Sequence, residues 1–539
     1  MGHPSDSEEV AHQHDVNPVE NQCYRRYYPG SESAVCVCNS GHCDLIEPFL
    51  PEETSGESAV VYVSSKTGLR MEKRTLTWTR SLKAHDDDAE EDRGLVEEED
   101  GTQVTGDDED NIQENKNFFC CSVTVHPNQR RQTILGFGGA FTDSVADGIG
   151  YTLARVPIGS TDFSESVYCY DDWEGDFQLL NFSLNHADYD FKIPFIKLAQ
   201  EIAGGAHKLR LFASPWSAPG WMKTTGQQVG GGFLKGSTTG PYYRTWADYF
   251  IKFLDAYKQD GIEFWAVSAQ NEPTANLFIV VAPDYQSMGF TWDTQKEFIK
   301  WSLGPRLRQA GYGHVQIMTL DDARQALPWW PYAVYADKEV SQYVGGVGVH
   351  WYQNWVPAFV LDLTYHANRD KFILATEAST GGGTDGGPLL GSWHRAELYA
   401  ADIITNLQHY VSGWVDWNMA LDLSGGPNWL RASVDSPILV NASGYEFLKQ
   451  PMFYAMGHFS KFIPANSTRV SADTPWWQFG SFDAAAVVTP TGRRVGVLMN
   501  RKSRAITATL LDDTRRGQRL RVHMPPRSFV TVLWDAPSS

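Results

Sequence analysis

Eight short apolar runs, each typical of a buried strand, constrain the fold of this chain more than any other feature of its sequence. Between most of them lie amphipathic helical patterns, at residues 245–257, 294–307 and 395–410 among others. The eight runs are residues 134–141, 151–156, 209–214, 264–269, 315–320, 347–351, 372–376 and 414–420. Eight strands joined by helical crossovers predict an α/β fold, a (β/α)8 TIM barrel.

One crossover of this barrel is too short. Between the first run and the second, only residues 143–150 remain for the connection. A parallel crossover needs about a dozen residues or more. We therefore expect the first barrel helix to be missing.

Strand-like patterns flank the barrel on both sides and predict a second domain. Alternating runs at residues 58–63, 75–79 and 118–125 precede the barrel, and runs at 495–499 and 529–534 follow it. We expect these N-terminal and C-terminal segments to form one discontinuous β-sandwich. The expected divisions are a disordered leader at 1–22, a β-rich segment at 23–132, the catalytic barrel at 133–461 and the C-terminal part of the sandwich at 462–539.

The net charge of −20 is concentrated in one segment. Residues 86–114 hold 15 Asp or Glu and the single base Arg93, so this segment carries −14 of the total. Acidic runs without aromatic residues stay solvated, and we interpret this one as a loop insertion with no catalytic role, or less plausibly as a cation-binding segment. No basic helix or stripe occurs elsewhere, so nucleic-acid binding is not expected.

Cysteine usage and sequons point to the secretory route. Four of the seven cysteines cluster near the N-terminus, at Cys23, Cys36, Cys38 and Cys43. Only the last two approach the spacing of a zinc knuckle, so two small-loop disulfides are favoured over zinc, in an oxidising compartment. Sequons at Asn181, Asn441 and Asn466 agree, although the N-terminus shows no signal peptide. No apolar run approaches the roughly 18 residues of a membrane span, so membrane contact is expected to be peripheral.

Two glutamates end two of the predicted strands. Residues 264–267 are bulky and apolar, and Pro273 must end that strand, which places Glu272 beside Asn271 at its C-terminal end. Residues 371–376 form a second apolar strand that ends at Glu377, followed by a glycine-rich loop. Barrel enzymes keep their chemistry at this end of the strands, and a pair of carboxylates is what glycoside hydrolysis requires. Tryptophan faces can stack on sugar rings, but each of the 19 tryptophans is by itself expected to be a core residue.

A series of motifs in conserved order resembles glycoside hydrolase family 30, and within it the enzymes that hydrolyse glucosylceramide. The matching segments include Gly136-Phe-Gly-Gly-Ala-Phe-Thr-Asp143, Arg155-Val-Pro with Asp162-Phe-Ser, Ala213-Ser-Pro-Trp216-Ser-Ala-Pro, Asn271-Glu272-Pro273, Val349-His-Trp-Tyr352, Gly413-Trp-Val-Asp-Trp-Asn418, Gly425-Gly-Pro-Asn-Trp429 and His458-Phe-Ser-Lys-Phe-Ile-Pro464. The resemblance runs from about Cys23 to the C-terminus. Residues 276–285 do not match the family's tyrosine-bearing loop well, and Thr161, Ser379 and Ala432 also depart from the family's pattern.

The resemblance implies a retaining mechanism, with Glu377 as the nucleophile and Glu272 as the general acid/base that must hold a proton while Glu377 is ionised. Asn271 would bond the sugar 2-hydroxyl. Asp162, Trp216 and Trp417 resemble the residues that hold glucose, and Arg155, His350 and Tyr352 those that orient the nucleophile. The alternatives are a purely structural ion pair for Arg155 and core positions for His350 and Tyr352.

The activity implied by the resemblance is hydrolysis of glucosylceramide to glucose and ceramide. Its expected partners are the glycosphingolipid substrate, an anionic membrane surface and a small saposin-type activator protein, and its expected destination is the lysosome. No cofactor and no metal are expected. Two alternatives stay open: a family 30 glycosidase acting on another β-linked glycan, and a catalytically inactive carbohydrate- or lipid-binding homologue that has lost the first barrel helix.

Overall fold

The computed structural model describes residues 22–80, 121–140, 149–278, 283–383, 386–478 and 480–537 of the chain. The predicted leader, apart from Gln22, and the acidic insertion lie outside the described residues. Within the described part, no helix has the length and apolar character needed to cross a membrane.

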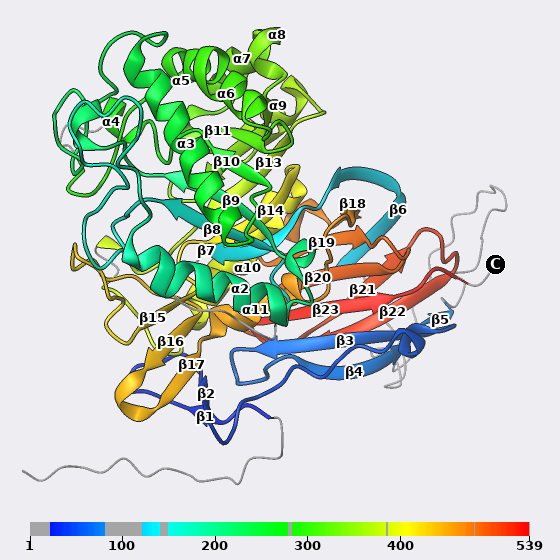
Figure 1. The fold of residues 1–539 in the computed structure, drawn as a ribbon. Coiled ribbons are helices and arrows are strands. Elements are labelled where there is room, and N and C mark those ends of the chain that lie inside the picture. Colours follow the sequence, from blue (N-terminus) through cyan, green and yellow to red (C-terminus); the bar gives the residue numbers. More distant parts are fainter. Residues whose placement is uncertain are drawn as a thin grey trace, which may run out of the picture.

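A closed barrel of eight parallel strands forms the centre of the chain, as predicted (Figure 1). Its strands lie in the order β10-β11-β12-β13-β14-β7-β8-β9. They are β7 (Gly136–Ala140), β8 (Leu153–Ile158), β9 (Arg210–Pro215), β10 (Ala266–Ser268), β11 (Gln316–Ala323), β12 (Val344–His350), β13 (Phe372–Glu377) and β14 (Val411–Asp416). Each corresponds to one of the eight apolar runs. The last run was predicted to continue to residue 420, but β14 ends at Asp416, so Trp417 follows the strand.

The barrel interior is a packed layer of side chains and not a channel. Six buried apolar residues, each from a different strand, form one cluster inside it: Leu153, Phe212, Ala266, Met318, Leu374 and Val415. Bulky side chains that alternate inward along parallel strands fill barrels in this way.

Helices surround the barrel. The principal ones are α2 (Ile193–Ile202), α3 (Pro241–Gln259), α5 (Trp292–Phe298), α6 (Gly304–Gln309), α7 (Trp329–Ala336), α9 (Phe359–Ala367), α10 (Trp393–Gln408) and α11 (Pro451–Ser460). In α3, Trp246, Phe250, Phe253 and Tyr257 recur at the spacing of one helical face, and all four are buried. The helix begins earlier than predicted because Pro241 occupies its first turn, where proline fits without loss of a hydrogen bond.

The first crossover is short, as expected. β7 and β8 pair as parallel neighbours, with Gly138 opposite Leu153. The chain between them is residues 141–152, of which the structure describes 149–152, and no helix occurs in these four residues. Ile149 lies against the end of α11, where Ser460 Oγ donates a 2.6 Å hydrogen bond to its carbonyl oxygen. The predicted loss of the first helix otherwise falls on residues 141–148, outside the described part.

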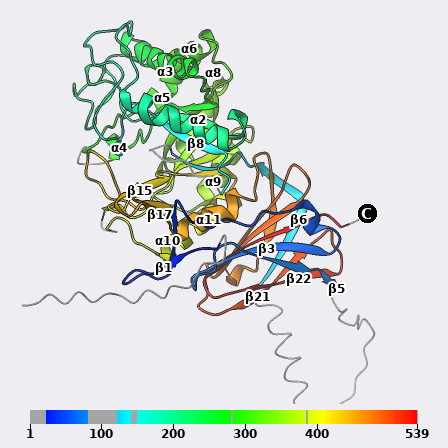
Figure 2. The ribbon, with the colours of Figure 1, turned by 60° about the horizontal axis from the view of Figure 1, so that its bottom comes forward.

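A ten-stranded sheet, antiparallel except for one parallel pair of strands, lies beside the barrel (Figures 1 and 2). It contains strands from both ends of the chain. N-terminal strands β3 (Ser58–Ser65), β4 (Glu72–Thr77), β5 (Thr79–Arg80) and β6 (Ser122–Thr133) combine with C-terminal strands β18 (Thr468–Asp473), β19 (Phe482–Val488), β20 (Arg494–Asn500), β21 (Ile506–Asp512), β22 (Gln518–Met524) and β23 (Ser528–Trp534). β4 and β5 stand at opposite ends of the strand order yet are separated in sequence by Trp78 alone. The sheet therefore curls around its own apolar core, which includes Trp78 and Trp534. This is the predicted discontinuous sandwich.

A smaller five-stranded sheet was not predicted. It combines β1 (Arg25–Arg26) and β2 (Val35–Asn39) with β15 (Ala420–Asp422), β16 (Ile438–Asn441) and β17 (Glu446–Lys449), in the order β1-β2-β17-β16-β15. The strands nearest the N-terminus thus pair with strands of the segment that follows β14. Of the N-terminal strands, only those from Ser58 onward belong to the sandwich. Disulfides Cys23–Cys36 and Cys38–Cys43 brace this sheet, which agrees with the expected two small-loop bridges.

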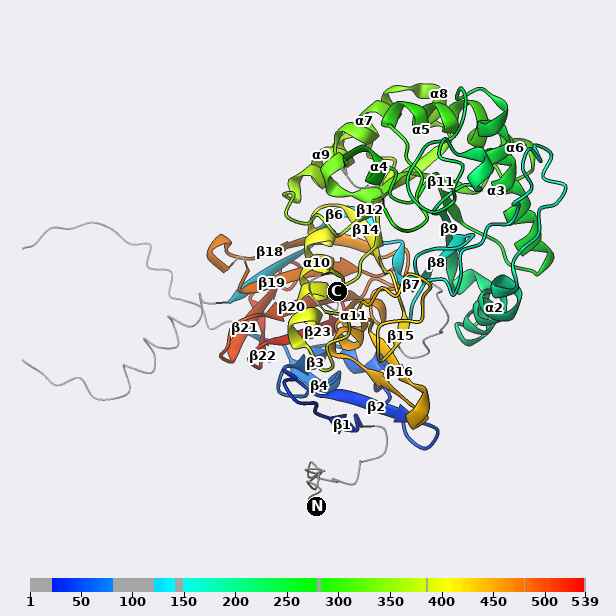
Figure 3. The ribbon, with the colours of Figure 1, turned by 90° about the vertical axis from the view of Figure 1, so that its left-hand side faces the viewer.

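Two helices, α10 and α11, lie between the barrel and the sandwich (Figure 3). On α11, His458 contacts Thr531 Oγ1 of β23 at 2.8 Å and Ser64 Oγ of β3 at 2.9 Å. On α10, Trp393 stacks on Phe529 with ring centroids 4.8 Å apart. The two domains are therefore joined by buried polar and aromatic contacts.

Candidate active site

Glu272 follows β10 in a constrained turn. Its backbone has φ +45°, in the left-handed region that a residue with a side chain rarely adopts. Its N–H donates to the carbonyl oxygen of Asp321 at 2.9 Å, and both the N–H and the hydroxyl of Thr274 donate to Asp322. These bonds hold the strained backbone and fix where the carboxylate points, as is common at functional sites.

Glu377 is the last residue of β13, and its side chain is buried except for a small part. Tyr352 donates a 2.6 Å hydrogen bond to Oε1, and Arg155 Nη1 donates to Oε2. Both carboxylate oxygens therefore accept hydrogen bonds, which fix the orientation of the side chain.

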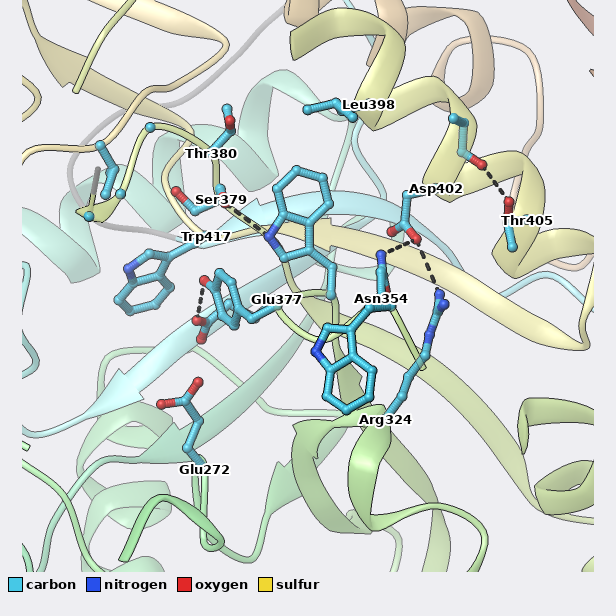
Figure 4. A pocket seen from close by; sticks show the side chains of 18 of the residues that line it. Glu272, Arg324, Asn354, Glu377, Ser379, Thr380, Leu398, Asp402, Thr405 and Trp417 are labelled. Atoms are coloured by element: carbon cyan, nitrogen blue, oxygen red, sulfur yellow. Dashed lines mark hydrogen bonds and ion pairs between the residues drawn. The ribbon is translucent and has the colours of Figure 1, made fainter. Parts of the chain in front are cut away.

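The two glutamates face each other across one pocket (Figure 4). One carboxylate oxygen of each, together with a ring nitrogen of His350, lie within 4.8 Å of one another. Carboxyl groups about 5 to 5.5 Å apart are typical of retaining glycosidases, whereas inverting enzymes separate them by about 6.5 to 9.5 Å. The short distance between the two carboxylate oxygens agrees with the smaller of these separations.

Arg155, at the centre of β8, lies behind the pocket and is fully buried. Besides Glu377, it donates to Asn271 Oδ1 at 2.7 Å, Asp321 Oδ2 at 2.9 Å and Ser214 Oγ at 3.2 Å. Because Oδ1 of Asn271 is occupied by Arg155, the NH2 group of that amide is directed away from Arg155. One guanidinium thus fixes the orientation of groups from four other strands or their ends.

Asp321 is a site residue that the sequence analysis missed. It accepts hydrogen bonds from Arg155, Ser214 and Thr376, and it faces Nε2 of His350 at 3.3 Å. Leu320 and Asp321 both have φ +64°, at a register shift between β11 and β12. Such a bulge re-aims a side chain, and here the backbone irregularity coincides with a carboxylate buried behind the pocket.

His350, at the end of β12, is buried among carboxylates. Burial alone would lower its pKa, but the charges and hydrogen bonds of Glu377, Asp321 and Glu272 outweigh burial and raise the pKa to about 10. The ring is therefore an imidazolium at neutral and acidic pH, and both of its nitrogens donate, Nδ1 to Glu272 at 3.3 Å and Nε2 to Asp321.

The pKa of Glu272 is lower than expected for a residue that must be protonated to act as a general acid. Burial raises it, but the hydrogen bond and charge of His350 and the hydrogen bond from Tyr285 outweigh burial, so the pKa lies below its ordinary value. The family resemblance implies that Glu272 holds the proton of the pair. The neighbouring imidazolium favours the ionised form of Glu272 instead.

Asp162 and two tryptophans form one wall of the pocket. Trp216 and Trp417 stack on each other with centroids 4.8 Å apart, and the guanidinium of Arg155 lies 4.7 Å from the Trp216 ring centroid. Oδ1 of Asp162 is buried and has no hydrogen-bond partner in the described part of the chain. Burial and the charges of Glu377 and Glu272 raise the pKa of Asp162 to about 8. An unpartnered acid beside an indole pair suits the hydroxyl groups and apolar face of a sugar.

All the sequence-predicted site residues are brought together. The cavity has a volume of about 1000 Å³. Seven of the predicted residues line it: Asp162, Trp216, Asn271, Glu272, Tyr352, Glu377 and Trp417. Arg155 and His350 lie directly behind them and bond to the two glutamates.

Two models of one protein family match most of the chain. The glycosyl hydrolase family 30 TIM-barrel domain matches residues 126–463, and the family 30 beta sandwich domain matches residues 466–532. The chain belongs to glycoside hydrolase family 30. It is therefore a glycoside hydrolase by family, with the barrel and sandwich that the family combines.

Relatives of this family 30 chain extend over nearly its whole length. It is 40% identical to putative glucosylceramidase 3 of Caenorhabditis elegans, over 96% of both chains. It is 38% identical to the lysosomal acid glucosylceramidase of Mus musculus, over 94% of both chains. Among solved structures, SrfJ from Salmonella typhimurium superposes with a TM-score of 0.73 at 25% identity, covering 89% of this chain and 99% of that one.

Tyr285 is the second site residue of this family 30 chain that the sequence analysis missed. It lies in the segment that did not match the family pattern, yet its hydroxyl donates to Oε2 of Glu272 at 3.0 Å. The main chain of this segment is tied down, because Gly230 N donates to the carbonyl oxygen of Tyr285 at 2.8 Å. No local sequence pattern predicts this contact.

Two groups in the described part of the chain have the composition of metal ligands, but neither suits an ion. The first is Glu272, His350 and Glu377, where the raised pKa of His350 keeps a proton on both ring nitrogens. A protonated imidazole cannot coordinate a metal. The second includes Cys38 and Cys43, whose sulfur atoms are bonded to each other.

Proposed function

We propose that this chain is a retaining β-glucosidase that hydrolyses glucosylceramide to glucose and ceramide. The observation that carries the proposal is the pair Glu272 and Glu377, with one oxygen of each carboxylate within 4.8 Å of the other, in a pocket with an indole wall. The substrate is supported by the glucosylceramidases that are 38–40% identical over almost the full length.

In the first step Glu377 attacks the anomeric carbon and forms a glycosyl ester, while Glu272 gives its proton to the departing ceramide oxygen. In the second step Glu272 takes a proton from water, whose oxygen attacks the same carbon and releases Glu377. Arg155 and Tyr352 hold the Glu377 carboxylate in position before attack. His350 and Tyr285 orient the carboxyl group of Glu272 on the opposite side of the pocket.

The lowered pKa of Glu272 gives the reaction its pH dependence. The first step requires Glu272 protonated, and the imidazolium of His350 holds its pKa below the ordinary range of a glutamate. The reactive form is therefore populated mainly in acidic solution, which agrees with an enzyme of an acidic compartment.

Glucose is expected to occupy the side of the pocket formed by Trp216, Trp417 and Asp162. The unpartnered Oδ1 of Asp162 would accept from sugar hydroxyls. The NH2 group of Asn271, directed away from Arg155, would donate to the 2-hydroxyl, a contact that strengthens in an oxocarbenium-like transition state.

A lysosomal destination and peripheral contact with an anionic membrane belong to the same proposal. The two disulfides suit the oxidising secretory route. Large exposed apolar side chains on the loop after β12 and on α9, Trp355 and Phe359, suit contact with a lipid surface near the pocket. A saposin-type activator remains an expectation from the family resemblance.

The test is hydrolysis of glucosylceramide in vesicles that contain anionic lipid, across pH 4 to 8, by the chain and by Glu377→Gln. We expect release of glucose at acidic pH and its loss in the variant. β-1,6-Linked glucan is assayed beside it, because another β-linked glycan is the alternative substrate. Turnover of the glucan with none of the glycolipid would replace the proposed substrate. Absence of all turnover in a folded chain would favour the inactive binding homologue.

A further inference from the structure

Lys223 is a fully buried lysine that the proposed mechanism does not use. It follows the short helix Gly220–Met222, in the loop between β9 and α3. Two further buried lysines, Lys192 and Lys449, each pair with an aspartate. In the described part of the chain no carboxylate pairs with Lys223, and burial lowers its pKa to about 7. Burying a cation without a counter-charge is unfavourable, so the contacts of this ammonium group need an explanation.

Main-chain oxygens hold the ammonium of Lys223. Its Nζ donates to the carbonyl oxygens of Gln228 at 3.0 Å, Gly230 at 3.0 Å and Ser287 at 2.7 Å. Three acceptors match the three N–H donors of an ammonium, whereas a neutral amine has only two. The protonated form is therefore the one that satisfies all three carbonyls, and it predominates in acidic solution, below the pKa of about 7.

These three bonds join two separate loops of the barrel. The first two acceptors lie in the loop between β9 and α3, whereas Ser287 lies between β10 and α5. The main chains of the two loops also contact each other, because Gly230 N donates to the carbonyl oxygen of Tyr285 at 2.8 Å and Gly289 N donates to that of Gly232 at 2.8 Å. The lysine adds a buried side-chain connection to these two main-chain bonds.

The segment that the lysine anchors carries a side chain of the active site. Tyr285 lies two residues before the anchored carbonyl, and its hydroxyl donates to Oε2 of Glu272 at 3.0 Å. The residue between them, Gln286, is fully buried, and its Nε2 donates at 2.8 Å to Oγ of Ser160, two residues before Asp162. A displacement of this segment would therefore move the tyrosine hydroxyl away from the glutamate.

We propose that Lys223 is a positioning residue for the glycosidase reaction: its ammonium fixes the segment at Ser287 and so keeps the hydroxyl of Tyr285 on Glu272. The inference rests on the proposed function, because it takes Glu272 as the acid/base residue. Lys223 does not line the cavity and acts only through the tyrosine. Its loss is felt at Glu272 as a weaker hydrogen bond to the ionised carboxylate.

The experiment follows the alkaline limb of the kcat/KM profile of Lys223→Met, with a chromogenic aryl β-glucoside as the substrate. Methionine is unbranched and has no donor for the three carbonyls. A weaker bond from Tyr285 raises the pKa of Glu272, so the limb is expected to move to higher pH by about 0.5 to 1 unit, up to a tenfold change in the ionisation constant. Glu272 titrates below its ordinary value of 4.5, where Lys223 of the native chain is still an ammonium.

A double variant shows whether Lys223 acts through Tyr285. In the Tyr285→Phe background the hydroxyl is absent, so Lys223→Met is expected to add no further shift of the limb. A shift of equal size in both backgrounds would mean that the lysine acts on Glu272 as a charge, and would overturn the inference. Amide hydrogen exchange of residues 283–290 is expected to be faster in Lys223→Met than in the native chain, and an unchanged rate would contradict the anchoring.

The matched control is Lys235→Met, which removes the same charge from the same loop. Nζ of Lys235 donates to the carbonyl oxygen of Trp221 at 2.9 Å, outside the anchored segment. This variant is expected to keep the native limb and the native exchange rate of residues 283–290. Lys223→Gln covers the case in which Lys223→Met folds poorly, because its amide is neutral and has at most two donors. It is expected to move the limb in the same direction.

The failure of the positioning role and of the proposed function give different results. If the unsubstituted chain hydrolyses no β-glucoside, the proposed function fails, whatever the exchange rates show. If the chain hydrolyses the aryl β-glucoside but the limb of a folded Lys223→Met, or of a folded Lys223→Gln where the first variant does not fold, stays at its native pH, only the role of Lys223 fails.

Discussion

Nδ1 of His350 lies 3.3 Å from Oε1 of Glu272, and each of the two groups changes the pKa of the other. The carboxylates around the imidazole raise its pKa to about 10, and the imidazolium in turn lowers the pKa of the proposed general acid. The pKa of Glu272, the proposed acid/base residue, is therefore lowered by a cation from a different strand and by the hydrogen bond that Tyr285 donates to its second oxygen.

Tyr285→Phe tests this tuning. The hydroxyl donates to Glu272 and so stabilises its ionised form, and its removal is expected to raise the pKa of Glu272. Because Glu272 must be protonated in the first step, the alkaline limb of the kcat/KM profile should move to higher pH. Tyr352→Phe, which removes a hydroxyl bonded to Glu377, should leave that limb in place. An alkaline limb that stays still, or moves to lower pH, in Tyr285→Phe would contradict the assignment of Glu272.

Asp162→Asn should raise the stability of the chain and lower its activity. Burial and the two glutamates raise the pKa of Asp162 to about 8, so the ionised carboxyl destabilises the folded chain as pH rises from about 4 toward 8. The variant should unfold at a higher temperature than the native chain at pH 7, with a smaller gain at pH 4. Its kcat/KM should fall by about 5- to 150-fold, the range expected for a lost sugar contact of about 1 to 3 kcal/mol. A variant that is both less stable and fully active would refute this role.

Arg155→Lys and Arg155→Met test whether the buried guanidinium positions the nucleophile. Lysine keeps the charge but cannot reach all four acceptors, so kcat should fall sharply while the chain still folds. Methionine leaves Asp321 and Glu377 buried without a cation partner from this position, and should lower the free energy of unfolding by about 3 to 5 kcal/mol. Urea unfolding and kcat are measured on both variants. If Arg155→Lys keeps native kcat, the ion pair is only structural.

His458→Gln tests how the buried histidine between the two domains contributes to stability as pH changes. Burial lowers the pKa of His458 to about 3, below its ordinary value near 6.5, so the unfolded chain binds more protons than the folded chain between these values. The contribution of the neutral ring is fully present above pH 6.5 and is lost as pH falls toward 3, by about 2 kcal/mol at pH 5. In His458→Gln the Tm should therefore fall less between pH 7 and pH 5 than in the native chain. A native-like fall in the variant would show that other groups cause it.

The sequence was most informative about features that are local along the chain. Each barrel strand is a continuous apolar run, and the two glutamates stand where such runs end, so the barrel and the pair could be placed without a structure. Asp321 carries the same signal, because an acidic pair follows the apolar run at residues 315–320, and it was missed only because the signal was applied to glutamates.

The contacts that escaped prediction are set by tertiary structure. The hydroxyl of Tyr285 reaches Glu272 through a loop without periodicity, held by the chain near Gly230. The pairing of β2 with β17 joins residues about 400 positions apart in the chain. The lowered pKa of Glu272 depends on His350 and Tyr285, which come from other parts of the fold, and no pattern around residue 272 contains that information.

The most direct test of the central claim is mass-spectrometric mapping of the chain after incubation with a fluorinated β-glucosyl fluoride, which forms a slowly hydrolysed ester in retaining enzymes. The predicted result is one fluoroglucosyl group per chain, on the peptide that contains Glu377, and none in Glu377→Gln. An ester on Glu272, or no ester in a preparation that hydrolyses β-glucosides, would contradict the assignment of the nucleophile and of the retaining mechanism.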